Sequence, residues 1–288
     1  FALTILKKRL LSSVAAFRHS LDTHSRTLGL RDRGEDAPSE EAVKAWQRKL
    51  RDDWDDDEEH VRDEDAALEE ATPFFGKLTA DEQKNLGEML SKAAMIAAQT
   101  DSKAAILMKW IEEHLLDEDR WNGERVVIFT EYLHTLEYLE RLLAERGWGE
   151  ALMRLTGGMT RGEREEVKEA FQAPPDQHPL RILLATDAAS EGLNLQNHCR
   201  YLIHYEIPWN PNKMEQRNGR IDRKGQRREP ICWHFEYADR HDQRFLDVII
   251  DKVRRQRHDL QSVGEVIARQ MERVMLGAEK EIRLDESR

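Results

Sequence analysis

Cysteine is scarce in this sequence: Cys199 and Cys232 are the two among 288 residues. They lie far apart and form no CxxC pair, so neither a disulfide framework nor a zinc ribbon is expected. A reducing, cytoplasmic setting fits this usage best. Long apolar runs are also missing, as is a charged-then-apolar leader, and we therefore expect no membrane span.

A phosphate cradle of the G-x-x-x-x-G-K-[ST] type is missing as well. The nearest approach is the run Gly76-Lys77-Leu78, which lacks the first glycine and the hydroxyl residue. A chain without this cradle cannot bind and orient Mg·ATP by itself, so we expect it to hydrolyse little or no ATP alone. Because the sequence begins at Phe1 without an initiator methionine, we interpret it as part of a longer protein.

The formal net charge of −11 would ordinarily argue against a nucleic-acid partner. Residues 52–70 account for all of it, with twelve Asp or Glu and one Arg. The remainder of the chain is balanced, and residues 213–228 hold seven Lys or Arg against Glu215 and Asp222. The acidity is thus confined to one segment, and a basic patch remains for an anionic partner.

Two short patterns imitate metal sites. Residues 57–60 spell D-E-x-H, but in that box the Asp must end a buried strand beside Mg²⁺, and here it follows further acidic residues. We interpret 57–60 as a coincidence within a solvated acidic run. His241 and His258 each precede an Asp without a second histidine at ligand spacing, so we expect no metal site.

Residues 1–100 show helical periodicity and few strand signals. Helical stretches are predicted at 3–17, 41–54 and 78–97. In the last of these, Thr79 followed by Glu82 has the spacing of a capping box. We expect a helical linker or protrusion that contains the acidic segment.

From residue 101 onward, strand-like runs alternate with helical ones, which is typical of βαβ units. The predicted strands are 126–130, 151–156, 182–186, 200–206 and 231–237, and the predicted helices between and around them are 102–116, 132–145, 160–171 and 210–225. The runs VVIF and ILL are apolar throughout, which suits strands buried on both faces. We expect an α/β lobe at 101–240, with a mostly parallel sheet and helices on both faces, and a helical extension at 241–288.

The segment QRNGRIDRKGQ, residues 216–226, is the most informative. Gln216, Arg220 and Arg223 are spaced i, i+4, i+7 and would share one face of a helix. Two guanidiniums held in this way grip a phosphate with forked hydrogen bonds, or neutralise charge during phosphoryl transfer. The alternative is a solvated basic helix face, and the spacing alone leaves both interpretations open.

Two loops that follow predicted strands are further candidates. The segment ILLATDAASEGLNLQ turns through small residues to Gly192, which would let a phosphate approach backbone N–H groups. The segment RLTGGMTRGEREEVKEAF could present amides and the Thr156 hydroxyl to a nucleic-acid phosphate. Taken alone, each loop is better explained as an ordinary connection, the second with Thr160 as a helix cap.

In their order, these segments resemble the second lobe of the Swi/Snf family of superfamily-two helicase-like ATPases. RVVIFTEYLHTLEYLERLL is similar to the fourth motif of the family, and the TGG segment to its G-S-T-x-x-x-R block. LLATDAASEGLNLQ and YEIPWNPNKMEQRNGRIDRKGQ resemble the fifth and sixth motifs. Order, spacing and identity match over residues 101–260, and KKRLLSS is more loosely similar to RapA-type and phage-defence relatives. The resemblance implies a RecA-like fold.

The resemblance also implies roles in nucleotide binding. Arg220 and Arg223 match the two arginines of the sixth motif, which reach the ATP phosphates from the second lobe. Gln216 matches the glutamine that opens that motif. Glu191 and Gly192 match the fifth motif at the interface between the lobes.

Other matching positions lie near the bound nucleic-acid backbone in the family: Thr130, Thr156, Gly157 and Thr186. Residues 209–211 match the WNP of the family, for which a partly structural role is expected. Asp187 is a departure, because many eukaryotic remodellers lack the ATD triplet whereas helicases of the wider superfamily have it.

We therefore expect the second lobe of an ATP-dependent translocase of double-stranded DNA, in the bacterial cytoplasm and associated with the nucleoid. ATP and Mg²⁺ would be held mainly by the first lobe, which is the expected partner of this one. One alternative is a strand-separating helicase of DNA or RNA in the same superfamily. An alternative of another class is a protein-docking module at 1–100, and the acidic run could also act as a nucleic-acid mimic.

Overall fold

The computed structural model describes residues 2–28, 41, 57–72, 78–188, 194–208 and 210–236. The predicted helix at 41–54 and the predicted extension at 241–288 lie outside these residues, apart from residue 41. No helix of the described part has the length and apolar character needed to cross a membrane.

Five parallel strands form one twisted sheet in the order β4-β5-β3-β6-β7. Their bounds are β3 Val126–Thr130, β4 Leu152–Leu155, β5 Ile182–Thr186, β6 Tyr201–His204 and β7 Ile231–His234. The two central strands with unbroken apolar runs, β3 and β5, are buried at every residue, as expected for strands covered on both faces. The predicted α/β fold of the RecA-like type is confirmed.

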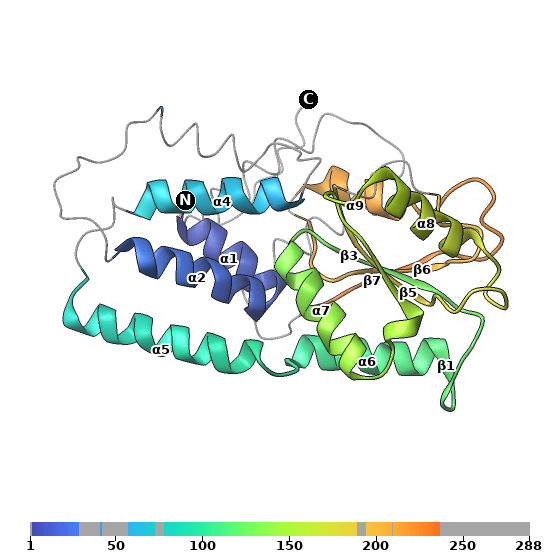
Figure 1. Cartoon of the computed structure of the whole chain (residues 1–288), viewed down its shortest axis with the longest axis horizontal. Helices are drawn as coiled ribbons and strands as arrows, with labels where there is room; N and C mark the ends of the chain where they lie inside the picture. Colours follow the sequence, from blue (N-terminus) through green and yellow to red (C-terminus); the bar gives the residue numbers. More distant parts are fainter. Residues whose placement is uncertain are drawn as a thin grey trace, which may run out of the picture.

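Alternate residues of the central strands enter two separate hydrophobic cores. Val126 and Ile128 pack with the helices α6 (Ser102–Leu115) and α7 (Leu133–Glu145) on one face. Val127 and Phe129 pack with the helix α8 (Arg161–Gln172) on the other. This follows from the two-residue period of a strand. Figure 1 shows the sheet between these helices.

A layer of helices precedes the sheet and lies beside it (Figure 1). It consists of α1 (Ala2–Ser12), α2 (Val14–Leu28), α4 (Asp57–Ala71) and α5 (Ala80–Ala97). In the centre, Phe17 and Leu21 of α2 pack on Ala93 of α5, while Leu68 of α4 packs on α1. The predicted helical region is therefore present, and its acidic segment from residue 57 onward is a helix.

Local signals account for several helix ends. Thr79 and Thr160 each form a complete capping box with the glutamate three residues later.

The short hairpin of β1 (Leu116–Asp117) and β2 (Arg120–Trp121) was not predicted from the sequence, and its turn places Glu118 at a positive φ of 58°. Two-residue strands are too short to show an alternating pattern.

Candidate nucleotide and nucleic-acid interface

The carboxyl ends of the parallel strands bring most of the predicted site residues to one edge of the sheet. Thr130 ends β3 and lies opposite Thr186, which ends β5. Thr156 and Gly157 directly follow β4, the neighbour of β5 on its other side. Ligands of open α/β sheets bind at this edge, so the edge is the candidate functional site.

A carboxylate joins the turns after β4 and β5. Oδ2 of Asp57 accepts a hydrogen bond from the Gly157 backbone N–H at 2.6 Å and another from the Thr186 hydroxyl at 2.6 Å. Asp57 is 4% exposed, and Thr186 is fully buried. The interpretation of Asp57 as part of a solvated run is therefore wrong, because Asp57 is buried where α4 (Asp57–Ala71) begins beside the sheet.

The Gly157 turn is fixed from its other side by α8. Arg164 donates through Nη2 to the Gly157 carbonyl, and through Nε to the carbonyl of Met159 at 3.2 Å. The sulfur of Met159 accepts from the Thr156 N–H at 3.3 Å. The turn thus presents the Gly157 N–H in a defined direction without help from a bound molecule.

Thr130 is placed differently from the other predicted nucleic-acid residues. Its hydroxyl is fully buried and donates to Oε2 of Glu206 at 2.8 Å. The same carboxylate accepts from the Ser12 hydroxyl of α1 at 2.8 Å and, through Oε1, from the Glu131 N–H at 2.5 Å. The Thr130 hydroxyl is thus bonded toward the helical layer through Glu206, although Thr130 is the strand partner of Thr186.

Glu206 is stabilised from two directions by cations. Nη2 of Arg217 lies 3.6 Å from Oε1 of Glu206, and Nζ of Lys103 donates to the carbonyls of Leu11 and Ser12 at the end of α1. Burial lowers the pKa of Lys103 to about 8, although Glu206 opposes this shift. Burial likewise raises the pKa of Glu206, and the two cations oppose it.

Arg217 is a central residue of the site that was not predicted as such. It is 1% exposed and donates to both oxygens of Asp187, at 2.6 and 2.8 Å. Burial favours the neutral form of Asp187, but the Arg217 guanidinium outweighs it and holds the pKa of that carboxyl below its usual range. This pair connects Asp187, directly after β5, to the basic segment. The ATD triplet at 185–187 and the run QRNGR at 216–220 were the sequence signals for the pair.

The basic segment begins with α9 (Pro211–Asn218), whose cap is Asn210 through a hydrogen bond from the Asn212 N–H at 3.0 Å. The helix ends at Asn218, which lies beside His204 at 2.9 Å. The predicted helix over 210–225 is therefore too long. The i, i+4, i+7 argument is wrong as geometry, because residues 220 and 223 lie in the turns after the helix.

Both arginines contact the segment that connects β5 to β6. The Arg220 carbonyl accepts from the Leu195 N–H at 3.1 Å, and Arg223 donates through Nη1 to Asn194. Both partners belong to the segment that follows β5. Gly225, at a φ of 105°, closes this turn in a conformation that favours glycine. Gln216 is on α9 and is exposed.

The donors of this edge fit phosphate oxygens. The Gly157 N–H and the Thr186 hydroxyl are groups of the kind that bind phosphate in proteins, as are the guanidiniums of the basic segment. Across the described ranges, no three His, Cys, Asp or Glu side chains are grouped to hold a metal ion. Glu191, Gly192 and Trp209 lie outside the described residues.

Residues 103–225 match the model of the helicase conserved C-terminal domain. Over 130 residues the chain is 35% identical to the uncharacterized ATP-dependent helicase YqhH of Bacillus subtilis, a match covering 45% of this chain and 22% of that protein. It is 33% identical over 122 residues to the RNA polymerase-associated protein RapA of Yersinia pestis, covering 42% of this chain and 12% of that one. The chain thus matches less than a quarter of the length of either relative.

Among solved structures, the C-terminal part of the Fun30 ATPase domain is similar with a TM-score of 0.46 and 17% identity, over 93% of this chain and 82% of that one. Residues 103–225 are thus similar to the C-terminal domain of helicases.

Proposed function

We propose that this chain is the second lobe of an ATP-dependent translocase of double-stranded DNA. The observation that supports the proposal is the meeting of two phosphate-type donors, the Gly157 N–H and the Thr186 hydroxyl, at the carboxyl edge of the sheet. The Gly157 N–H and the Thr186 hydroxyl already bind one carboxylate oxygen there. Arg223 lies beside the segment that continues from β5.

In the proposed enzyme, Arg220 and Arg223 act as arginine fingers. They would contact the phosphates of an ATP held mainly by the first lobe, together with Gln216, Glu191 and Gly192. ATP with Mg²⁺ supplies the phosphoryl transfer that drives the cycle. A guanidinium neutralises the charge that develops on the transferred group.

The second part of the proposal is a grip on the nucleic-acid backbone by Thr156, Gly157 and Thr186, with Thr130 as a neighbouring support. Backbone N–H groups and hydroxyls read phosphates and carry no sequence information. We therefore expect binding that is independent of sequence and weakens with salt. Such binding suits movement along a duplex.

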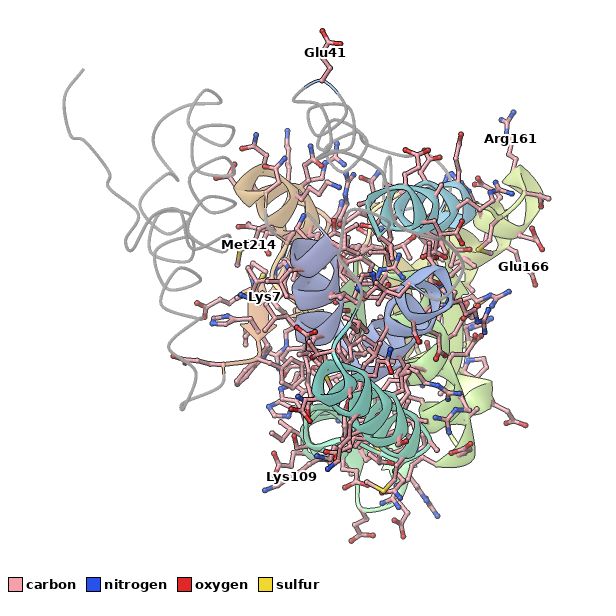
Figure 2. All side chains as sticks on the ribbon, turned by 90° about the vertical axis from the view of Figure 1, so that its left-hand side faces the viewer. Lys7, Glu41, Lys109, Arg161, Glu166 and Met214 are labelled. Atoms are coloured by element: carbon pink, nitrogen blue, oxygen red, sulfur yellow. The ribbon has the colours of Figure 1, made fainter. Side chains whose placement is uncertain are left out.

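The arginine fingers are tested in the whole protein that carries both lobes. Replacing Arg220 and Arg223 by Ala should lower DNA-stimulated ATP turnover by about a thousandfold without weakening ATP binding to the same extent. Arg161→Ala is the matched control, because Arg161 is exposed on α8 and points away from the body of the molecule (Figure 2). Unchanged turnover in the double variant would refute the assignment.

The 288-residue chain by itself should hydrolyse no ATP above background, because it lacks the G-x-x-x-x-G-K-[ST] cradle. In the whole protein, displacement of a triplex strand without separation of the duplex would support translocation. Separated strands would favour the helicase alternative.

We further propose that the lobe comprises 101–240, between a helical protrusion at 1–100 and an extension at 241–288. The helical protrusion is the proposed docking surface for a protein partner. The proposed setting is the bacterial cytoplasm, next to the nucleoid. A pull-down that uses the 288-residue chain, with and without competing DNA, tests for the partner.

A further inference from the structure

The Gly157 and Thr186 donors, to which we assign a nucleic-acid phosphate, are engaged by an acid from the same chain. Asp57 is a hundred residues or more from both in sequence, yet it accepts from both at 2.6 Å. We propose that Asp57 and its helix α4 are an intramolecular competitor of the nucleic-acid backbone, so that DNA binds this lobe when α4 leaves the edge of the sheet. This inference rests on the proposed nucleic-acid function of the same donors.

The two donors cannot serve both acceptors at once. A backbone N–H carries one hydrogen, and so does a threonine hydroxyl. A carboxylate oxygen and a phosphate oxygen are both anionic acceptors of short, charge-assisted hydrogen bonds. Because Asp57 is 4% exposed and Thr186 is fully buried, a phosphate oxygen cannot reach the Thr186 hydroxyl while Asp57 remains in place.

The remainder of α4 is docked so that Asp57 is held at this position. The Arg9 guanidinium of α1 donates to Oε2 of Glu64 at 2.5 and 3.0 Å, in a pair that is buried on both sides. His19 of α2 bonds Asp65 at 2.6 Å. These contacts come from two helices of the accessory layer, which therefore presents Asp57 to the sheet as a preformed unit.

The charge of α4 extends the competition beyond one hydrogen bond. The helix DEEHVRDEDAALEEA contains eight Asp or Glu, one Arg and one His. Glu59, Glu69 and Glu70 are exposed. A duplex that approached the carboxyl edge would meet this negative charge before it reached the donors, and the repulsion would be strongest at low salt.

The test measures binding of a fluorescein-labelled duplex DNA to the 288-residue chain by fluorescence anisotropy. Asp57→Ala should bind about tenfold more tightly than the wild type, since a buried charge-assisted competitor has been removed. Glu59→Gln is the matched control: it removes one charge from the exposed face of the same helix and should change affinity by much less. Equal affinities for wild type, Asp57→Ala and Glu59→Gln would overturn the proposal.

A second measurement covers the case in which Asp57→Ala disturbs the fold. Hydrogen exchange of the wild-type chain should show the amides of α4 exchanging faster when saturating DNA is added, while those around Gly157 become more protected. Protection of α4 that is unchanged by bound DNA would overturn the competition.

The outcomes also separate this inference from the proposed function. If wild type binds duplex DNA and Thr186→Val weakens it, while Asp57→Ala binds no more tightly than wild type, then the competition is wrong and the backbone site stands. If no variant binds DNA, both the proposed function and the competition fail.

Discussion

Arg217 gives the sharpest test of how the site is held together. Its guanidinium is 1% exposed and makes two hydrogen bonds to Asp187, a third to the Glu206 carbonyl at 3.1 Å, and a close approach to the Glu206 carboxylate. Arg217→Met keeps much of the apolar volume but removes the charge. Two acids at the carboxyl edge of the sheet would then lose their principal cation.

Removing one partner of a buried ion pair costs about 3–5 kcal/mol of unfolding free energy. Asp187 keeps 17% of its side chain exposed, so water can compensate in part. We therefore expect Arg217→Met to lower the free energy of unfolding by about 3 kcal/mol, at the lower end of that range. The free energy of unfolding of Arg217→Lys should lie between those of the wild type and Arg217→Met, because an ammonium cannot bond both Asp187 oxygens in a fork.

The loss should also depend on pH in a defined direction. In the wild type, Arg217 keeps the pKa of Asp187 below its usual value, so the pair stabilises above the unfolded pKa and loses this contribution as pH falls through the folded one. Without Arg217, burial raises the pKa of Asp187. The deficit of Arg217→Met should therefore be largest near neutral pH and shrink in acid.

Urea unfolding of the 288-residue chain, followed by far-UV circular dichroism, measures both effects. Arg161→Met is the control, because this arginine is exposed and its replacement should change stability by less than about 0.5 kcal/mol. Adding Asp187→Leu to Arg217→Met should recover part of the loss, because no unpaired acid remains at that position. A deficit below about 1 kcal/mol, or one that stays constant with pH, would refute the reasoning.

Two further predictions concern stability. Thr160→Ala removes the capping box of α8 and should cost about 1 kcal/mol in urea unfolding; no loss would show that α8 is held by packing alone. Burial lowers the pKa of His204 to about 3, so its stabilising contribution is complete above the unfolded pKa and is lost as pH falls toward 3. His204→Gln should therefore reduce the loss of stability between neutral pH and pH 5 by about 2 kcal/mol, and an unchanged acid profile would contradict this.

The central strands β3 and β5 were predictable because apolar neighbours cover them on both faces. The segments 126–130 and 182–186 agree with the observed β3 and β5, since a strand covered on both faces must be apolar throughout. The caps at Thr79 and Thr160 were equally predictable, because a capping box is decided within four residues. The edge strands β4 and β7 end at Leu155 and His234, earlier than the predicted ends at 156 and 237, because fewer neighbours define the ends of an edge strand.

The helix α9 was predicted too long, to residue 225 instead of Asn218, because basic residues at helical spacing can also occur in a run of turns. Asn218 and Gly219 form a helix end that the spacing argument did not weigh. Asn218 also lies beside His204 at the end of β6. Only the tertiary contact explains why the helix ends at this residue and not one turn later.

Asp57 could not have been placed from sequence. Its partners are 100 and 129 residues away, and nothing in an acidic run distinguishes a buried carboxylate from its exposed neighbours. Arg217 was hidden for a related reason: it stands inside a segment whose other arginines fit the phosphate interpretation. Both positions are defined by long-range contacts, which local periodicity does not contain.

Glu206 connects parts of the molecule that otherwise have little in common. Its side chain receives Ser12 from α1, Thr130 from β3 and the N–H of Glu131, and its backbone carbonyl receives Arg217 of α9. A displacement of α1 would thus disturb the hydrogen bond between Ser12 and Glu206, and with it the contact of Glu206 with Arg217 on α9. Glu206 therefore connects the accessory helices to Arg217, in addition to the direct contacts that Ser12 and Asp57 make with the lobe.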